Sequence, residues 1–332
     1  MKSTYVKFGV VILLLGVAPF FLSLFYINLL SEILILAIFA VGLNVLVGYT
    51  GLISLGHAAF FGVGGYTAAL IAQNLSSNVL VTLGLAILGS LIVASVLGIF
   101  CIRVNGFYFL MLTLALSQMI YSYIHQSTNL TGGSNGLSGI PSPSIGGFTF
   151  SNPVFIFYLT GVIFLLIYII LRIVLHSPFG KVLVGIRENE DRIQSMGYNT
   201  SMYKYAAFII AGGIGGIAGA MYTYFNGFIA PTDVYWTMSG TALFMVIIGG
   251  AGTLLGPILG AGLIVTMETI VSSYTDMWML IIGIVFIVFV IFFPRGIVGI
   301  GESIYQFLFK NRFHSYKRNV KSKVNNIERR AE

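Results

Sequence analysis

The sequence predicts an all-α, polytopic integral membrane protein with about 8–10 transmembrane helices. Three observations predict this class. Hydrophobic residues make up 57% of the 332 residues and charged residues only 8%, with a mean hydropathy of +0.96, so the charges are too few to cover a soluble surface. Apolar runs of spanning length, roughly 17–25 residues, recur along the chain. The basic residues also collect in alternate loops, as in membrane proteins.

The apolar runs predict spans at about 8–27, 32–49, 55–73, 79–101, 106–124, 153–175, 205–226 and 277–293. The first run follows Lys2 and Lys7 in the manner of a signal peptide, but it is too long and no small-residue cleavage site follows. The Gly-interrupted segment 240–271 starts on the outside, so it must enter the membrane and return. We expect it to form two short helices or a re-entrant hairpin that turns at 249–252.

The basic residues orient the chain. With a cytoplasmic N-terminus, all 17 Lys and Arg residues fall on the cytoplasmic side, and the last span returns the C-terminus to that side. Arg103, Arg172 and Arg295 each lie at the cytoplasmic end of a span. This positive-inside distribution explains the net charge of +7 as a topology signal, without a nucleic-acid partner. The single cysteine, Cys101, excludes a disulfide framework and a Cys-based metal site.

The chain divides into a transmembrane domain, 1–300, and a basic cytoplasmic tail, 301–332. We expect the tail to be held near anionic lipid at about 1 kcal/mol for each basic residue. The outside loop 125–153 has no Lys, Arg, Asp or Glu and is rich in Gly, Ser, Asn and Pro. Its composition predicts an ordered, turn-rich loop or a short re-entrant segment.

Charged residues are concentrated in the cytoplasmic loop 176–204. The spacing predicts one short amphipathic helix with Ile186, Ile193 and Met196 on one face, ended by Gly197. This loop is either a solvated connection between spans or a surface presented to a soluble partner.

Enzymatic motifs carry little weight. Residues 132–136 (GGSNG) fit the G-x-S-x-G pattern, but the strand and helix of a nucleophile elbow are missing around them. Residues 180–181 (GK) lack the rest of a phosphate-binding loop, and no His-Glu-x-x-His motif or carboxylate cluster offers metal ligands. We therefore expect no catalytic residues, no metal and no cofactor. If ATP drives this protein, another chain must hydrolyse it.

Two groups of residues within the spans are candidates for a role. Glycines at four-residue spacing allow helices to approach closely in lipid: Gly212, Gly215, Gly216 and Gly219. Polar side chains are costly in hydrocarbon unless they face protein or water, so each is either an interhelical hydrogen-bonding group or part of a translocation path: Asn44, Ser54, His57, Tyr66, Thr113, Gln118 and Glu268.

Several motifs resemble one known family, the branched-chain amino acid ABC transporter permeases. They lie in the family's order within about residues 30–300: 51–62 (GLISLGHAAFFG), 106–109 (GFYF), 113–115 (TLA), 131–137 (TGGSNGL), 187–190 (RENE) and 249–257 (GGAGTLLGP). The long Gly-rich outside loop is similar to the LivM-type subunit more than to its LivH-type companion.

The resemblance implies a permease subunit that imports branched-chain amino acids by alternating access in a bacterial inner membrane. It implies a LivH-type permease partner, two ATPase subunits of LivG/LivF type and an extracytoplasmic binding protein. In the family's ATPase-coupling loop it places Arg187, Glu188, Glu190, Asp191, Met196 and Gly197. The triplet Glu190-Asp191-Arg192 stands where ABC permeases commonly have Glu-Ala-Ala. Importers of urea or short amides share these motifs, and an ATP-independent channel or carrier is a further alternative.

Overall fold

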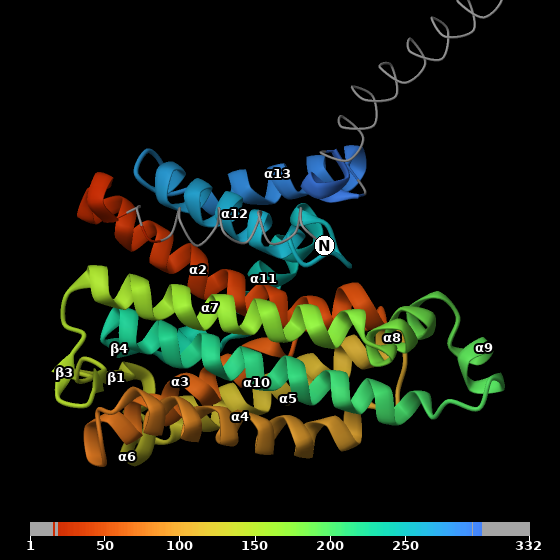
Figure 1. Cartoon of the computed structure of the whole chain (residues 1–332), viewed down its shortest axis with the longest axis horizontal. Helices are drawn as coiled ribbons and strands as arrows, with labels where there is room; N and C mark the ends of the chain where they lie inside the picture. The colour runs from red at the N-terminus through yellow and green to blue at the C-terminus, as the bar shows by residue number, and fades with distance from the viewer. Residues whose placement is uncertain (1–15, 17–18, 294, 301–332) are drawn as a thin grey trace, which may run out of the picture.

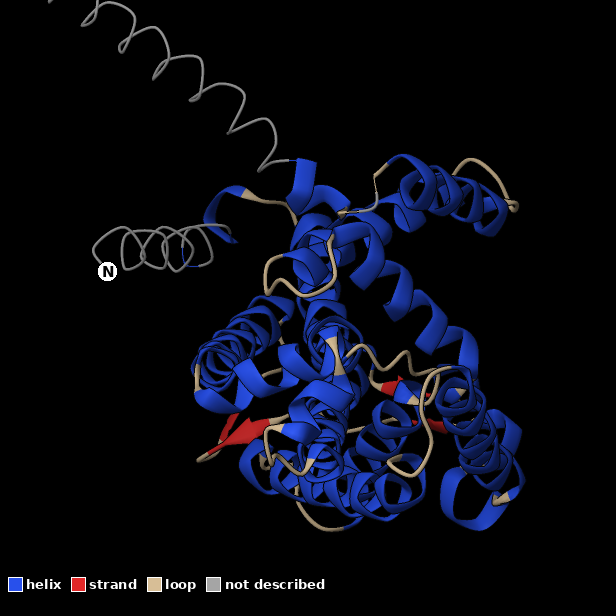
Figure 2. Cartoon of the chain, turned by 90° about the vertical axis from the view of Figure 1, so that its right-hand side faces the viewer, coloured by secondary structure: helices blue, strands red, loops and turns tan. Residues whose placement is uncertain are grey.

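The computed structural model describes residues 16, 19–293 and 295–300, and its helices form one bundle (Figure 1). Many of them are seen end-on when the molecule is viewed from one end (Figure 2). The long helices are α2 (Leu24–Asn44), α3 (His57–Asn74), α4 (Val79–Cys101), α5 (Phe107–Gln126), α7 (Pro153–His176) and α10 (Thr200–Asn226). The shorter apolar helices are α11 (Trp236–Gly249), α12 (Gly256–Ser272) and α13 (Trp278–Phe292).

The membrane class is confirmed. Among the described residues, five helical segments are long and apolar enough to cross a membrane: Leu24–Thr50, Val79–Cys101, Phe107–Gln126, Pro153–His176 and Thr200–Asn226. The last four correspond one by one to predicted spans. The Asn78 side chain caps α4 by accepting from the Leu80 N–H at 3.0 Å, and Asn152 caps α7 in the same way. These polar caps explain why both helices begin where the apolar runs begin.

The break predicted at 28–31, between the first two spans, is wrong in position, because the helix is interrupted earlier, at Leu22 and Ser23. α2 begins at Leu24, inside the first predicted span, and continues into the π-helix η1 (Val45–Thr50). Ser31 does not end the helix, because its hydroxyl donates to the Ile27 carbonyl one turn earlier at 2.8 Å. The polar side chain is thereby satisfied within the helix, and the backbone ladder stays intact. Most of the predicted span 8–27 and the whole tail 301–332 lie outside the described residues.

The segment 240–271 forms two short helices, α11 and α12. Two short helices were one of the two predicted alternatives. Gly250 and Gly252 turn the chain between them with φ values of +120° and +83°. The helix ends are in close contact, because a Cβ added at Gly249 would lie 1.8 Å from the carbonyl oxygen of Gly256. Glycine is therefore required on geometric grounds at this turn.

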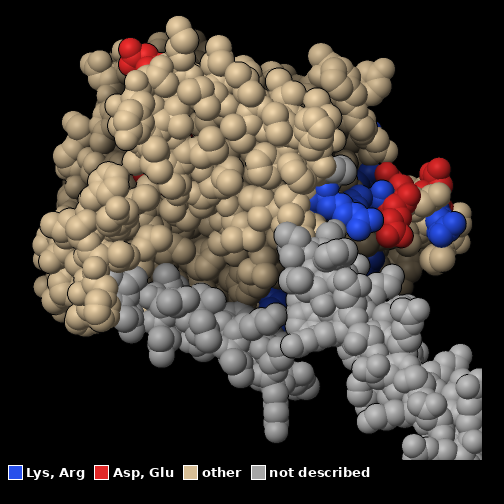
Figure 3. Space-filling model, turned by 90° about the horizontal axis from the view of Figure 1, so that it is seen from above, with Lys and Arg blue, Asp and Glu red and all other residues tan. Residues whose placement is uncertain are grey.

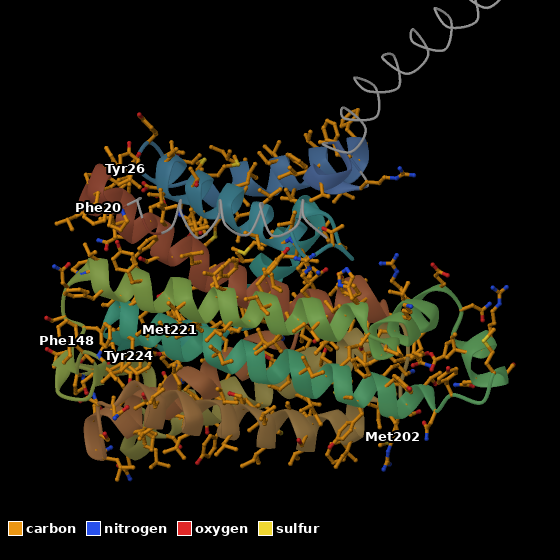
Figure 4. All side chains as sticks on the ribbon, viewed as in Figure 1. Phe20, Tyr26, Phe148, Met202, Met221 and Tyr224 are labelled. Carbon is orange, nitrogen blue, oxygen red and sulfur yellow. The ribbon has the colours of Figure 1, made fainter. Side chains whose placement is uncertain are left out.

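The bundle has two distinct ends. The sheet end carries β1 (Leu137–Ser138), β2 (Ser144–Ile145), β3 (Phe148–Thr149) and β4 (Phe228–Ile229), with β1 antiparallel to β4 and β2 antiparallel to β3. With α6 (Thr128–Thr131) and η2 (Gly133–Asn135), these short elements make 125–153 an ordered loop. The charged end carries α8 (Pro178–Glu188) and α9 (Glu190–Ser195). Phe148 and Tyr224 lie at the sheet end and Met202 lies at the charged end (Figure 4).

Glycines of α10 lie where this helix crosses its neighbours. A Cβ added at Gly216 would lie 2.0 Å from the Ser90 hydroxyl of α4, and one at Gly219 would lie 1.8 Å from the Phe61 carbonyl oxygen of α3. Gly212 faces Ala94 of α4, and Gly215 faces His57 and Phe60 of α3. Because lipid gives no hydrophobic drive for helix association, such backbone contact is a main source of packing energy.

Candidate coupling site and buried polar residues

The charged loop 176–204 forms two helices, so the prediction of a single amphipathic helix is wrong. Asn189 has an extended backbone (φ −162°, ψ 101°) between α8 and α9. Its side-chain oxygen accepts from the Arg192 N–H at 2.9 Å and caps α9. The break changes the direction of the residues after it: Ile186 is 5% exposed and Met196 is 64% exposed, so they do not share a face.

Gly197 ends α9, as its position predicts. Its φ is +90°, and its N–H donates to the Gln194 carbonyl at 2.8 Å. The Tyr198 N–H donates to the Ile193 carbonyl at 3.3 Å. These two bonds form a Schellman motif, in which a left-handed residue satisfies the last carbonyls of the helix. The motif turns the chain sharply into α10.

An exposed surface of mixed chemistry covers this end of the molecule. We call it the loop platform and define it by five exposed residues: Glu188, Asp191, Met196, Tyr198 and Met202. On the face shown in Figure 3, the Lys and Arg residues gather at this end, with several Asp and Glu residues beside them. Methionines adapt to a partner's shape, and charged residues around them are typical of a protein-binding surface.

A buried ion pair fixes α9 to the bundle. The Lys204 Nζ lies 2.6 Å from the Glu190 Oε1 and donates to the Asn105 Oδ1 at 2.7 Å. The Thr200 hydroxyl donates to the same Glu190 oxygen at 2.9 Å and accepts from Gln194 at 2.9 Å. Lys204 is 2% exposed. Glu190, a predicted coupling residue, thus points toward α10 and the α4–α5 turn.

Arg187 is an exposed residue, but its guanidinium also contacts the bundle. Its Nη1 donates to the carbonyl of Gly48 in η1, which places the last turn of α8 against the end of the apolar segment Leu24–Thr50. Of the predicted coupling residues, Glu188, Asp191 and Met196 therefore lie on the loop platform. Arg187 and Glu190 hold the two helices to the rest of the protein.

Three of the predicted path residues lie together around the non-helical segment 51–56. The Thr113 hydroxyl of α5 accepts from the Leu55 N–H at 3.3 Å, and the Ser54 hydroxyl accepts from the Gly56 N–H at 3.2 Å. His57 follows at the first position of α3. Irregular backbone within a membrane survives only where its polar groups are satisfied, and the two hydroxyls satisfy the N–H groups of Leu55 and Gly56.

His57 and Tyr66 are both buried on α3, nine residues apart, and Tyr66 belongs to a separate cluster with Ile229 and Val234. The His57 ring stacks on Phe39 with 4.8 Å between ring centroids, and a Cβ added at Gly42 would lie 3.1 Å from its Nε2. The Tyr66 hydroxyl and the Gln118 Nε2 make no hydrogen bond to the described residues. Both His57 ring nitrogens are buried without a hydrogen-bond partner among the described residues as well.

Asn44 and Glu268 lie elsewhere. The Asn44 amide bonds to the turn between α11 and α12, donating to the Thr253 carbonyl at 2.9 Å. Glu268 lies on α12, which packs on α2 and brings it within electrostatic range of Glu32. The predicted path residues thus divide into separate groups, and Glu268 does not join the group around 51–56.

The structure adds residues that the sequence did not indicate. The Ser239 hydroxyl of α11 accepts from the Ala58 N–H at 2.7 Å and joins the first turns of two helices. Asp233, in η3 (Pro231–Val234), accepts from the Ala230 N–H at 2.9 Å. Burial raises the pKa of Asp233, while the bond from Ala230 lowers it. In the sequence, Ser239 is distinguished only as a small hydroxyl residue near the start of a helix. Many other serines have such a position, so the sequence could not single it out.

Within the described part of the chain, no three His, Cys, Asp or Glu side chains are grouped so that they could hold a metal ion. The candidate site therefore consists of the exposed loop platform at the charged end and the polar side chains inside the bundle.

Comparison with known proteins identifies the family. Residues 25–290 match the family described as branched-chain amino acid transport system / permease component. The chain is 28% identical over 315 residues to the high-affinity branched-chain amino acid transport system permease protein LivM of Salmonella typhimurium and equally to that of Escherichia coli, covering 88% of this chain and 74% of each relative. It is 30% identical over 260 residues to a probable branched-chain amino acid transport permease protein LivM of Methanocaldococcus jannaschii, covering 71% of this chain and 73% of the relative.

No solved structure matches the chain. The match spans most of the helical bundle, and the chain belongs to the branched-chain amino acid transport permease family.

Proposed function

We propose that this protein is the membrane permease subunit of an ATP-binding cassette importer for branched-chain amino acids. It works by alternating access driven by separate ATPase subunits. The loop platform carries the proposal, because it presents exposed Met, Tyr and acidic side chains from α8, α9 and the start of α10, and an ion pair fixes α9 to α10. A partner that moves the platform moves the helices behind it. The relatives' names support branched-chain amino acids as the cargo.

The charged end faces the cytoplasm in this proposal, as do both termini. All the described Lys and Arg residues lie at or near that end: Arg103, Arg172, Lys181, Arg187, Arg192, Lys204 and Arg295. This distribution follows the positive-inside rule. The ATPase subunits, of LivG/LivF type, dock on the loop platform. The extracytoplasmic binding protein docks at the sheet end, in the inner membrane of a bacterium.

The exposed face of α5 distinguishes it from the other long helices. Residues at helical spacing form a stripe that we call the α5 stripe: Tyr108, Met111, Ala115, Met119 and Tyr123. The exposed faces of α4 and α7 carry aliphatic residues instead: Leu80, Leu88, Ile92, Val96, Val162, Leu166, Ile170 and Ile173. Aliphatic side chains suit lipid, whereas Tyr and Met are enriched at protein interfaces. We therefore assign the α5 stripe to the LivH-type subunit and to the path between the two subunits.

A cysteine on the α5 stripe is expected to crosslink to the second permease subunit. The test places Met111→Cys or Met119→Cys in a Cys101→Ala background and pairs each with single cysteines along the helices of the partner. Leu166→Cys on α7 is the matched control, because Leu166 is about as exposed as the two methionines but lies on a helix face that carries aliphatic residues. Crosslinks from Leu166→Cys and none from the α5 stripe would place the interface on the other side of the bundle.

Uptake of labelled leucine, isoleucine, valine and urea tests the cargo directly. Cells that lack this gene are compared with complemented cells. We expect the deletion to abolish high-affinity uptake of the three amino acids and complementation to restore it, because their apolar side chains suit an uncharged path. Loss of urea uptake alone would leave the same architecture with a different cargo. Uptake that persists when the partner ATPase cannot hydrolyse ATP would favour a channel or carrier.

A further inference from the structure

The side chain of Arg187, an exposed residue, contacts two chain turns at the charged end. Its Nη1 donates to the Gly48 carbonyl. A Cβ added at Gly51 would lie 2.9 Å from the Arg187 Cγ, and one added at Gly252 would lie 2.7 Å from Nη1. Both glycines have positive φ, +75° and +83°. Glycine at these positions therefore makes room for the arginine as well as for the turns.

The Gly48 carbonyl needs a donor from outside its own helix. It lies near the C-terminus of the α2–η1 segment, where the last carbonyls of any helix lack intrahelical partners. Gly48 is buried, and a buried carbonyl without a donor is costly. A guanidinium both donates to that carbonyl and complements the negative end of the helix dipole. Arg187, 139 residues further along the chain, is thus the C-terminal cap of α2–η1.

The same junction includes the turn between α11 and α12. Asn44 donates from Nδ2 to the Thr253 carbonyl at 2.9 Å, and its Oδ1 accepts from the Gly252 N–H at 3.0 Å. A Cβ added at Gly48 would lie 2.0 Å from that Oδ1. The end of α8, η1 and the α11–α12 turn are therefore joined by hydrogen bonds through the Asn44 and Arg187 side chains.

The π-helical geometry of η1 suits this segment to a shift between two positions. A π-helical turn holds one residue more than an α-helical turn, and such turns are frequent at functional sites. The segment 51–56 follows η1 directly and leads to α3. There the Leu55 N–H bonds to Thr113 of α5, and the Ala58 N–H bonds to Ser239 of α11. A displacement of η1 therefore reaches the starts of α3 and α11 and the middle of α5.

We infer that Arg187 is a positioning residue that transmits displacement of α8, through the Gly48 carbonyl, to η1 and to the segment 51–56 at the start of α3. The inference rests on the proposed function and adds a mechanical role for one residue. It gives the Nη1 of this exposed residue a partner within the permease itself.

The test compares Arg187→Met with Arg103→Met in the complete reconstituted complex. Methionine keeps the unbranched stem that packs on Gly51 and removes the donors. Arg103 is the matched control, because it is exposed at the same end and its side chain makes no hydrogen bond or ion pair with described residues. Arg187→Lys keeps the charge and one donor. ATPase co-purification, ATP hydrolysis and labelled leucine uptake are measured on the same vesicles.

We expect Arg187→Met to retain the ATPase subunits and to lower the leucine transported per ATP by about tenfold, the effect of losing ~1.4 kcal/mol. For Arg187→Lys we expect the leucine transported per ATP to lie between the values of this variant and of the unmodified complex. Arg103→Met should change the ratio by less than about twofold, as for an exposed charge. A merely structural role would lower uptake and hydrolysis together and leave their ratio unchanged, which would overturn the inference.

A second measurement reads the movement itself. Ile53 lies in the segment 51–56 and is 43% exposed. Ile53→Cys in a Cys101→Ala background is labelled with a water-soluble maleimide, with and without ATP and vanadate. Nucleotide should change the labelling rate, and Arg187→Met should abolish the change. A response that persists in Arg187→Met would overturn the inference.

Two further outcomes separate the inference from the proposed function. If the unmodified complex takes up no leucine with ATP, the proposed function fails. If the unmodified complex transports but Arg187→Met loses the ATPase subunits while Arg187→Lys retains them, Arg187 is a docking residue and only the inference fails.

Discussion

Replacement of Gly219 by valine is expected to prevent folding, so that no monodisperse protein is recovered from the membrane. An added Cβ at Gly219 would lie 1.8 Å from the Phe61 carbonyl oxygen and 3.0 Å from the Gly65 nitrogen. Both are backbone atoms of α3, so no side-chain rotation relieves the clash and α3 and α10 must separate. Overpacking typically costs ~1–3 kcal/mol where side chains can yield, and here they cannot. Size-exclusion chromatography of detergent extracts measures the outcome.

Gly84→Ala is the control for this variant. Gly84 lies within α4 and no atom lies within 4 Å of an added Cβ. Alanine has the higher helix propensity by about 1 kcal/mol, so yield and stability should be unchanged or improved. Recovery of Gly219→Val at the level of Gly84→Ala would show that α3 and α10 do not pack as described.

Replacement of Lys204 by methionine is expected to release α9 from the bundle and to destabilise the protein. Lys204 is 2% exposed, and its loss leaves the Glu190 carboxylate without a cation and the Asn105 side chain without its donor. Breaking a buried pair in this way costs ~3–5 kcal/mol. We expect the lower end of that range, because the Glu190 side chain is 24% exposed. Thermal unfolding in detergent and retention of the ATPase subunits measure the two effects.

A double-mutant cycle with Glu190→Gln isolates the pair. Glutamine at position 190 keeps an oxygen that accepts from the Thr200 hydroxyl. The substitution therefore removes the negative charge and keeps this hydrogen bond. If the ion pair holds α9 in place, the two substitutions together should destabilise less than the sum of the single effects. Additive effects would show that Lys204 and Glu190 act independently. Lys181→Met, an exposed lysine of α8, should leave the unfolding temperature unchanged.

The sequence by itself determined the membrane class and most helix positions. Hydropathy is a local property, because the free energy of moving a residue from water to lipid depends on that residue and its immediate neighbours. The run at 79–101 therefore corresponds to α4 at both ends, and the glycines at 249–252 lie between α11 and α12. The family resemblance was also readable, because its motifs are short and contiguous.

The tertiary structure alone decided how the charged loop is used. Period and spacing predict one helix through Asn189, but the Asn189 side chain caps α9 and divides it from α8. Glu190 turns inward because Lys204 and Thr200, on α10, come within hydrogen-bonding distance. Arg187 bonds to a carbonyl 139 residues away. Pairings of this kind depend on which helices approach one another in space. The local periodicity of the sequence does not indicate which helices these are.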